Sequence, residues 1–438
     1  MINLYPHQQQ ALARLKFHDQ YMLAMDQGTG KTLPTLWHIR DLVTWGKAKY
    51  CLIVCPKAVV GSWERDIKKF DRNDMLTLEG ACTITTYDKV WRDPQFDTDW
   101  DIIVLDEAHK IKNRNSKRGK FLLNLALKSK YRYLLTGTPI SNGQLENVWS
   151  LMAFLHPVKG ARSVSCKDFG SYYDWCQRYA YLNQWHQPYS YKHVEELQAI
   201  LKANSYRVLK SECLDLPDKL PDEIYDIELL EKKRYKEMMK ESTIEDLELI
   251  ASNGLSRMTK LRTLCSGFVN TESGELVEMK CEKMDALVDF LEDMGEGKLV
   301  IFCEYRHSIE QVDKLLAELR VKHLVLSGDT KDKTCWTKFQ TDESIKVIVC
   351  QYQTANAGID LYAADTMLFY EPTLSSNVLE QAKDRIHRIG QHRPCRYVHF
   401  LTKGTIEHSI YNSLKNYADF SIKLFQQYIT DYAKGVKV

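Results

Sequence analysis

The sequence lacks the features that mark membrane-spanning, secreted and zinc-stabilised proteins. No uninterrupted apolar stretch reaches the ~18 residues that a membrane span needs, and the N-terminus, MINLYPHQQQ, has no basic segment followed by an apolar one. The twelve cysteines include no CxxC pair, which indicates neither a zinc site nor a disulfide framework. Scattered thiols are typical of a reducing compartment. We therefore expect a soluble protein without a membrane partner, nucleoid-associated or in infected-cell cytoplasm, with a nuclear location left open.

An excess of charge of either sign is also missing. The 438 residues include 60 Lys and Arg and 58 Asp and Glu, which gives a formal net charge of +2. This balance neither indicates nor excludes nucleic-acid binding, because a local basic track is sufficient for it. The composition, 44% hydrophobic and 27% charged, is that of an ordinary globular protein. The length suggests two or three domains.

Short apolar runs recur along the chain, with helix-length segments between them. Runs without polar alternation predict strands that are buried on both faces of a parallel sheet, and their alternation with helices predicts an α/β fold. The runs form two groups, before about residue 140 and after about residue 297. The predicted strands are Tyr50–Cys55, Asp101–Leu105, Tyr131–Leu135, Lys298–Cys303, Lys346–Cys350, Met367–Tyr370 and Arg396–Leu401.

The segment between the two groups is rich in charged residues, Tyr and Leu at helical spacing. It predicts a helical insert, with a linker through the prolines of LPDKLP, and the end of the chain predicts an amphipathic helix. We expect a first lobe over residues 1–155, helical protrusions and a linker over 156–280, a second lobe over 281–415 and a C-terminal helical brace over 416–438.

The segment LAMDQGTGKT has the glycine, lysine and threonine spacing of a phosphate-binding loop. Its glycines let backbone N–H groups point at phosphate oxygens, its lysine neutralises the β- and γ-phosphates, and its threonine hydroxyl can bind Mg²⁺. Met25 stands where the general pattern has glycine, and a glycine-rich turn that merely precedes Lys-Thr is the alternative. The predicted nucleotide-binding residues are Gly28, Thr29, Gly30, Lys31 and Thr32.

An acidic motif, Asp106-Glu107-Ala108-His109, follows the apolar run DIIVL. The C-terminal tip of a strand is where an α/β site collects its polar groups. We expect Asp106 to hold Mg²⁺ and Glu107 to orient and deprotonate the attacking water. An acidic turn without function is the alternative, which the phosphate-loop pattern upstream makes the weaker one.

A third element, QAKDRIHRIGQ, places Arg385 and Arg388 three residues apart, so that on a helix they would share one face. Two guanidinium groups on one face can reach a γ-phosphate across a cleft as arginine fingers. From the spacing alone, a solvated basic helix face is the favoured interpretation.

Taken together, these motifs resemble those of the Swi/Snf-type ATPases of helicase superfamily two, and the match runs nearly from end to end. DEAH or GKT alone occurs in many motors, whereas the combination of HRIGQ, the LTGTP run and the LPDK linker is specific to this family. The segments that carry the resemblance are LYPHQ, LAMDQGTGKT, IVCPKAVVGSWERDI, ITTYD, DEAHKIKN, LLTGTPISNGQLENVWSLMAFLHP, YRVLKSECLDLPDK, QTANAGIDLYAADTMLFYEP and QAKDRIHRIGQ.

The resemblance implies two RecA-like parallel-sheet lobes that bind ATP in the cleft between them. It places Gln8 in the adenine-contacting position and adds Gly358 and Asp360 to the nucleotide site, with Asp360 where the family has Asn. The residues that it assigns to coupling between ATP and DNA are His109, Thr136, Thr138 and Gln381. Those that it assigns to DNA contact are Lys57, Ser62, Trp63, Thr85, Thr86 and Thr354.

The resemblance favours a double-stranded DNA translocase that displaces or remodels DNA-bound proteins or DNA structures. Two alternatives stay open: a strand-separating or fork-remodelling DNA helicase, and a nucleotide-gated DNA-binding scaffold without significant turnover. ATP and Mg²⁺ are the expected cofactors, and DNA, bound through its backbone phosphates without sequence preference, is the expected partner. Because the motor motifs occupy nearly the whole chain, we expect either a protein partner or DNA structure to direct it to its target.

Two surface features have open interpretations. The basic run Lys110–Lys120 beside the acidic motif would extend a DNA track or form a solvated loop and helix start. The aromatic-rich segment Phe169–Tyr191 suits base stacking. Core packing is the favoured account of that segment, because aromatic side chains dominate protein cores.

Overall fold

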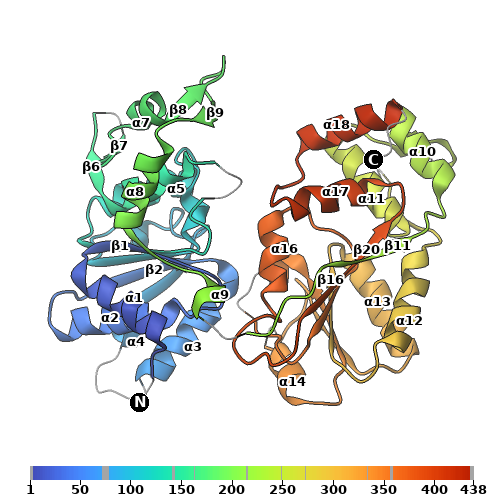
Figure 1. Ribbon diagram of the computed structural model, residues 1–438, viewed down its shortest axis with the longest axis horizontal. Helices are drawn as coiled ribbons and strands as arrows, with labels where there is room; N and C mark the ends of the chain where they lie inside the picture. Colours follow the sequence, from blue (N-terminus) through green and yellow to red (C-terminus); the bar gives the residue numbers. More distant parts are fainter. Residues whose placement is uncertain are drawn as a thin grey trace. The chain divides into compact units, whose positions relative to one another are not determined.

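The computed structural model divides the chain into two compact units, unit 1 over Met1–Asp215 and unit 2 over Leu216–Val438. The structure describes residues 3–71, 78–140, 144–161, 163–213, 216–247, 249–271, 273–332, 334–355 and 359–434. Each unit is an α/β body around one six-stranded sheet (Figure 1). No helix in these ranges has the length and apolar character needed to cross a bilayer.

The sheet of unit 1 is parallel throughout, in the order β10-β1-β5-β4-β2-β3. Its strands are β1 (Gln20–Met25), β2 (Cys51–Cys55), β3 (Cys82–Thr86), β4 (Ile102–Asp106), β5 (Tyr131–Leu135) and β10 (Ser205–Val208). Two antiparallel hairpins lie outside this sheet, β6 (Pro157–Lys159) with β7 (Val164–Cys166) and β8 (Ala180–Leu182) with β9 (Pro188–Tyr191).

Helices cover both faces of this sheet, which explains why its strands are apolar without alternation. Along β1, Leu23 and Met25 pack against one group of helices, whereas Met22 and Ala24 pack against the other. The first group is α1 (Pro6–Phe17), α2 (Thr32–Thr44), α3 (Val60–Asp71) and α4 (Leu78–Ala81). The second is α5 (Lys117–Ala126), α6 (Asn147–Leu155), α7 (Tyr172–Tyr179) and α8 (Val194–Ala203). Short helical turns are η1 (Lys57–Val59), η2 (Pro94–Phe96), η3 (Ala108–Ile111) and α9 (Lys210–Cys213).

The sheet of unit 2 is also parallel throughout, in the order β11-β20-β19-β16-β18-β17. Its strands are β11 (Glu223–Ile227), β16 (Leu299–Cys303), β17 (His323–Leu326), β18 (Val347–Gln351), β19 (Thr366–Phe369) and β20 (Arg396–Thr402). Two smaller hairpins pair β12 (Thr243–Ile244) with β13 (Leu249–Ile250), and β14 (Phe268–Asn270) with β15 (Leu276–Glu278).

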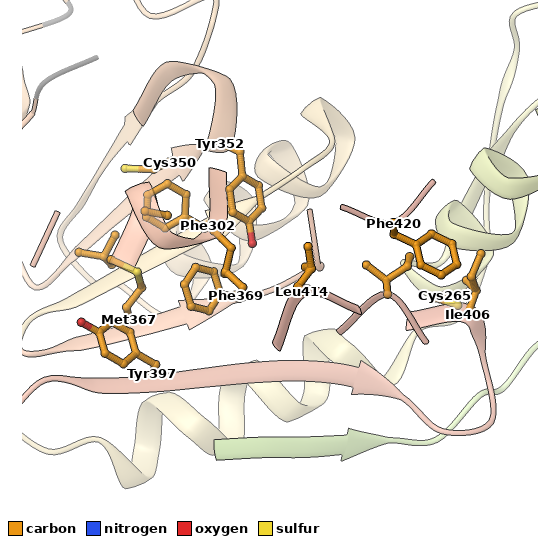
Figure 2. Close-up of a cluster of buried hydrophobic side chains, with 14 of the residues drawn as sticks. Cys265, Phe302, Cys350, Tyr352, Met367, Phe369, Tyr397, Ile406, Leu414 and Phe420 are labelled. Atoms are coloured by element: carbon orange, nitrogen blue, oxygen red, sulfur yellow. The ribbon is translucent and has the colours of Figure 1, made fainter. Parts of the chain in front are cut away.

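Helices α12 (Glu282–Asp293) and α13 (Arg306–Glu318) pack on one face of the second sheet. The other face carries a larger core, in which the rings of Tyr352, Phe302 and Phe369 pack together (Figure 2). The Tyr352 centroid lies 5.1 Å from that of Phe302 and 6.2 Å from that of Phe369. The helices that contribute to it are α10 (Lys232–Glu241), α11 (Gly254–Cys265), α14 (Trp336–Thr341), α15 (Tyr352–Ala355), α16 (Ser376–Lys383), α17 (Ile406–Lys415) and α18 (Ile422–Ala433).

Two helix-covered parallel sheets confirm the predicted α/β fold. Each of the predicted strands is present, and both of its ends lie within one residue of the predicted limits. The predicted insert region, 156–280, contains helices α7, α8, α10 and α11. It also supplies β10 to the first sheet and β11 to the second. Both are edge strands with partly exposed residues, so neither has the apolar run that marks a buried strand.

A buried ion pair joins α12 to α17 in unit 2. Lys283 is 0% exposed and Glu407 is 1% exposed, and the Lys283 Nζ lies 2.6 Å from the Glu407 Oε1. The same ammonium donates to the carbonyl of Tyr370 at 3.1 Å, and Glu407 Oε2 accepts from the Thr402 N–H at 2.8 Å. Every partner in this cluster is desolvated, so removing one partner leaves the others with unmet charge.

Glu407→Ala is expected to lower the free energy of unfolding by about 3–5 kcal/mol, because it leaves a buried ammonium unpaired. Urea denaturation followed by circular dichroism measures the change. Glu228→Ala, which breaks an exposed ion pair with Lys403, is the matched control and should have a far smaller effect. Equal losses of unfolding free energy in the two variants would contradict a stabilising role for the buried ion pair.

Candidate nucleotide-binding site

The predicted phosphate loop connects the end of β1 to the start of α2, as such a loop requires. Gly28 has φ 79° and Gly30 has φ 77°, in the left-handed region that favours glycine. The Thr29 Oγ1 donates to the Asp26 carbonyl at 2.7 Å and closes the loop on itself. The glycines are therefore required by the backbone, and Thr32 begins the helix that follows.

The loop also explains the bulky residue at its start. Met25 is the last residue of β1, its side chain is 0% exposed in the core, and only its carbonyl faces the loop. Lys31 donates through its Nζ to that carbonyl at 2.9 Å and to the Asp26 carbonyl at 3.3 Å. The lysine is thus held over the loop by its own backbone.

Gln8 lies against the phosphate loop. Its Nε2 donates to the carbonyls of Thr29 and Gly30, each at 3.3 Å, and its Oε1 accepts from the Tyr5 N–H at 3.0 Å. A Cβ at Gly30 would lie 2.3 Å from this amide. Beside it, His7 contacts the Thr29 carbonyl through Nε2 at 2.9 Å, a contact that the sequence did not reveal. Gln8 therefore braces the loop, and its predicted adenine contact stays a prediction.

The acidic motif lies at the end of β4, where Asp106 is the last strand residue. Burial raises the pKa of Asp106 to about 6, and the negative charge of Glu107 adds to this rise. The Trp63 Nε1 donates to the Asp106 Oδ2 at 2.9 Å, and the Tyr87 hydroxyl donates to the Asp106 carbonyl at 2.8 Å. The positive charge of Lys31 lowers the same pKa, so the two motifs act on one another electrostatically.

Glu107 has an unusual backbone conformation, with φ 54° and ψ 53°. A residue other than glycine in this region carries strain, which is concentrated at functional sites. Its Oε1 accepts from the Gln27 Nε2 at 3.1 Å, and its Oε2 lies 3.3 Å from the His109 Nδ1. Because Gln27 belongs to the phosphate loop, a direct hydrogen bond joins the loop to the acidic turn.

The predicted coupling threonines lie beside the same loop. Thr136 is 0% exposed and its Oγ1 accepts from the Thr138 N–H at 3.1 Å, whereas Thr138 is exposed. A Cβ at Gly137, between them, would lie 3.4 Å from the Met25 carbonyl. The LTGTP turn therefore packs directly against the phosphate loop.

The donor set around Asp106 suits Mg²⁺. The described residues contain no group of three or more His, Cys, Asp or Glu that could enclose a metal. Mg²⁺ commonly uses one or two carboxylates together with phosphate oxygens and water. Asp106 and the hydroxyl of Thr32 are the residues that would hold it, and the ion would neutralise charge on the phosphates.

Two predicted DNA contacts of unit 1 need correction. Trp63 is 1% exposed and packs with Ile67 and Phe70 on the apolar face of α3, and Thr85 is 3% exposed within β3. Neither side chain can meet a DNA strand from these positions. Trp63 instead positions Asp106 through the indole N–H. The other predicted contacts keep some exposure and stay predictions: Lys57, Ser62, Thr86 and, in unit 2, Thr354.

Trp63→Phe is expected to lower the apparent affinity for Mg²⁺ or the turnover number by about 10–100-fold, because it removes the bond that orients Asp106 while keeping an apolar aromatic ring in the core. Mg²⁺ titrations of ATPase activity measure the effect. Trp45→Phe, at a residue 55% exposed, is the control. Wild-type Mg²⁺ dependence in Trp63→Phe would remove this positioning role.

The arginines of unit 2 do not share a helix face, contrary to the sequence prediction. Helix α16 ends at Lys383, and the two arginines lie in the turns that follow. The Arg385 carbonyl accepts from the Leu361 N–H at 2.9 Å, so it bonds to a neighbouring segment rather than continuing the helix. Arg385 is 7% exposed, and Gln381 lies half-buried in the last turn of α16.

Arg388 has a defined anchor. It forms an ion pair with Asp360, and its Nη1 donates to the Ile359 carbonyl at 3.0 Å. Asp360 thus holds Arg388, and its predicted nucleotide contact stays a prediction. Gly358 lies outside the described residues.

The segment that resembles the family's linker bonds to a nucleotide motif within each unit. In unit 1, Asp26 of the phosphate loop donates through its N–H to the Val208 carbonyl at 3.0 Å, and its Oδ2 accepts from the Lys210 N–H at 2.9 Å. In unit 2, His387 contacts the Pro217 carbonyl through Nε2 at 2.9 Å. Lys219 lies 3.2 Å from the Asp384 Oδ1.

Comparisons with known proteins agree with this geometry. Family models match residues 72–268 as an SNF2-related domain, 282–390 as a helicase conserved C-terminal domain, and 1–141 as the res subunit of type III restriction enzymes. A phosphate loop bonded to an acidic turn on a parallel sheet, followed by a helicase C-terminal domain, defines a helicase-like ATP hydrolase. The chain belongs to the Swi/Snf-type ATPases of helicase superfamily two.

Two curated relatives illustrate the likeness. The human SWI/SNF-related matrix-associated actin-dependent regulator of chromatin subfamily A member 1 is 27% identical over 440 residues, which cover 89% of this chain and 40% of the relative. The TATA-binding protein-associated factor mot1 of Aspergillus fumigatus is 26% identical over 497 residues, which cover 93% of this chain and 26% of the relative. The chain thus spans less than half the length of either relative.

Among solved structures, the chain is similar to the Sulfolobus solfataricus SWI2/SNF2 ATPase core in complex with dsDNA. That likeness has 26% identity and a TM-score of 0.44, and covers 100% of this chain and 94% of the other.

Proposed function

We propose that the protein is an ATP-dependent translocase on double-stranded DNA that displaces or remodels DNA-bound proteins or DNA structures. The observation that supports this most is the direct bond between Gln27 of the phosphate loop and Glu107 of the acidic turn. It joins the loop proposed to bind the phosphates to the carboxylate proposed to activate water. A nucleotide-gated scaffold would have no use for a strained, positioned carboxylate.

In the proposed cycle, Lys31 and the loop N–H groups bind the phosphates and Glu107 accepts a proton from the attacking water. Asp106 and Thr32 would hold Mg²⁺, which would neutralise charge on the phosphates. The arginines of unit 2 stabilise the transferring γ-phosphate in the closed state. Hydrolysis removes that contact, so each turnover changes the spacing between the DNA-binding surfaces of the two units.

We expect the protein to contact the phosphate backbone of the DNA, which repeats regardless of sequence. Lys57 and Ser62 near the start of α3 are the candidates for contact in unit 1. We therefore expect little sequence preference and a strong dependence of binding on salt.

An ATPase panel tests this function. Steady-state hydrolysis is measured with double-stranded DNA, single-stranded DNA, RNA and no nucleic acid, at one salt concentration. Duplex DNA should give the largest stimulation. Stimulation by RNA or by single strands alone would overturn the proposed substrate.

A second candidate function is strand separation or fork remodelling. The observation in its favour is the hairpin β8–β9 of unit 1, which carries exposed aromatic side chains. Unwinding of a forked duplex, measured against displacement of a protein or third strand from a blunt duplex, distinguishes the two functions.

A further inference from the structure

The aromatic-rich segment of unit 1 divides into a buried and an exposed half. Trp175 is 0% exposed and Tyr179 is 2% exposed, so the favoured core-packing interpretation fits these residues. In contrast, Tyr181 is 50%, Trp185 70% and Tyr189 68% exposed. These three belong to the hairpin β8–β9 and its turn, which lies far from α1 and α2 in unit 1 (Figure 1).

The turn of this hairpin is ordered by its own hydrogen bonds. The Asn183 Oδ1 accepts from the N–H groups of Trp185 at 2.9 Å and Gln187 at 3.0 Å, and the Asn183 N–H donates to the Gln187 carbonyl at 2.9 Å. His186 between them has φ 57°. The backbone thus holds Trp185 at the tip without burying its ring, although burial of an indole is normally favourable.

The other exposed rings lie together on the hairpin, next to a cation. The ring centroids of Tyr181 and Tyr189 are 6.5 Å apart, and the Lys192 Nζ lies 5.4 Å from the Tyr181 ring. Exposed rings beside positive charge are the combination that binds unpaired nucleotides, because every base offers a face for stacking.

A polar pocket of about 500 Å³ lies beside the turn of the hairpin. Gln187 and Pro188 form part of its wall, and the loop before α5 forms another part with Lys112 and Arg114. The Arg114 guanidinium lies over the Tyr172 ring, 3.8 Å from its centroid, which fixes the guanidinium in the pocket. Asn113 and Asn115 add amide groups to the lining.

The charge of this pocket favours an anion. Residues 109–127 contain six Lys and Arg and no Asp or Glu. Glu146 is the one acidic side chain among the lining residues, and it accepts a hydrogen bond from the Tyr191 hydroxyl. A protein partner would be expected to meet an apolar wall, whereas amides and guanidinium match phosphates and base edges.

We propose that the hairpin β8–β9 and the pocket beside its turn bind an unpaired DNA strand. The bases stack on Trp185, Tyr189 and Tyr181, and Lys112 and Arg114 bind the phosphates. A blunt duplex offers its bases to these rings only at its ends, so the site selects forks, gaps and single-stranded tails. This inference rests on the proposed function only in taking DNA as the substrate.

Binding of a fluorescent (dT)20 strand without nucleotide tests the proposal by anisotropy. The double variant Trp185→Ala with Tyr189→Ala should bind on the order of tenfold more weakly or worse, since each stacked ring contributes substantially. Phe17→Ala, at an exposed ring of α1 (84% exposed), is the matched control and should bind as the wild type does. Unchanged affinity of the double variant would overturn the proposal and leave a protein partner as the occupant.

Lys112→Gln tests the proposed phosphate contact independently of the stacking rings. The slope of log affinity for (dT)20 against log salt should become shallower by about 0.7, the value for one lost phosphate contact on a single strand. An unchanged slope would contradict the assignment of Lys112. ATPase stimulation by a closed circular duplex should persist in all these variants. Loss of this stimulation in the wild type would contradict the proposed function, whereas unchanged strand binding in the variants would contradict only the role of the hairpin.

Discussion

Glu107→Gln is expected to bind ATP with near wild-type affinity and to lose hydrolysis by about 10²–10⁴-fold, the usual contribution of a general base. The amide keeps the size of the side chain and can still bond to Gln27, but it cannot accept a proton from water. Fluorescent-nucleotide binding and steady-state phosphate release with saturating duplex DNA measure the two effects separately.

The control for this variant is Glu64→Gln, an exposed carboxylate on α3, which should hydrolyse ATP normally. Wild-type hydrolysis by Glu107→Gln would remove Glu107 from its assigned role. Loss of nucleotide binding together with hydrolysis would show that the residue supports the loop through Gln27 rather than the chemistry.

Arg385→Ala and Arg388→Ala are each expected to lower hydrolysis by about 10³–10⁵-fold, the effect of losing an arginine finger. ATP binding should persist in both variants, because Lys31 and the phosphate loop belong to unit 1. Single-turnover hydrolysis with DNA present, together with nucleotide affinity, measures the change.

Two further variants separate a catalytic role from a structural one. Arg393→Ala removes an arginine of the same segment that pairs with Asp365 and is half-exposed, and it should retain activity. Asp360→Asn keeps Arg388 but removes its ion pair, so it should lose activity less severely than Arg388→Ala. Full activity of both finger variants would contradict the proposed role.

The sheets and the arrangement of the candidate nucleotide site of unit 1 could be predicted because their signals are local. An apolar run such as that before Asp106 requires burial on both faces, and a strand that ends in a carboxylate places it at the edge where polar groups gather. Gly28 and Gly30 mark left-handed backbone that other residues rarely adopt. The strands, the carboxylate at a strand end and the glycine turn all depend on few contacts between residues that are distant in the sequence.

Other features depend on tertiary contacts that the sequence does not display. The helix predicted across Arg385 and Arg388 ends at Lys383, and the Arg385 carbonyl beyond it bonds to Leu361, which is distant in the sequence. Trp63 matched a DNA-contact motif, yet helical spacing with Ile67 also predicts the buried face that it occupies. That second signal could have been recognised from the sequence.

The bonds of the linker were likewise not predictable, because each joins a side chain to a backbone group that is distant in the sequence. Asp26 accepts from the N–H of Lys210, and His387 contacts the carbonyl of Pro217. Each bond joins the linker to a turn that also carries a nucleotide motif. A conformational change at either turn would therefore alter the hydrogen bonds of the linker within the same unit.

Displacement of a third strand from a DNA triplex tests the central claim most directly. A motor that uses ATP to move along a duplex should release the third strand with ATP, and should release none with Glu107→Gln or without nucleotide. Duplex-stimulated hydrolysis that never releases the third strand would show that the protein consumes ATP on DNA without travelling along it.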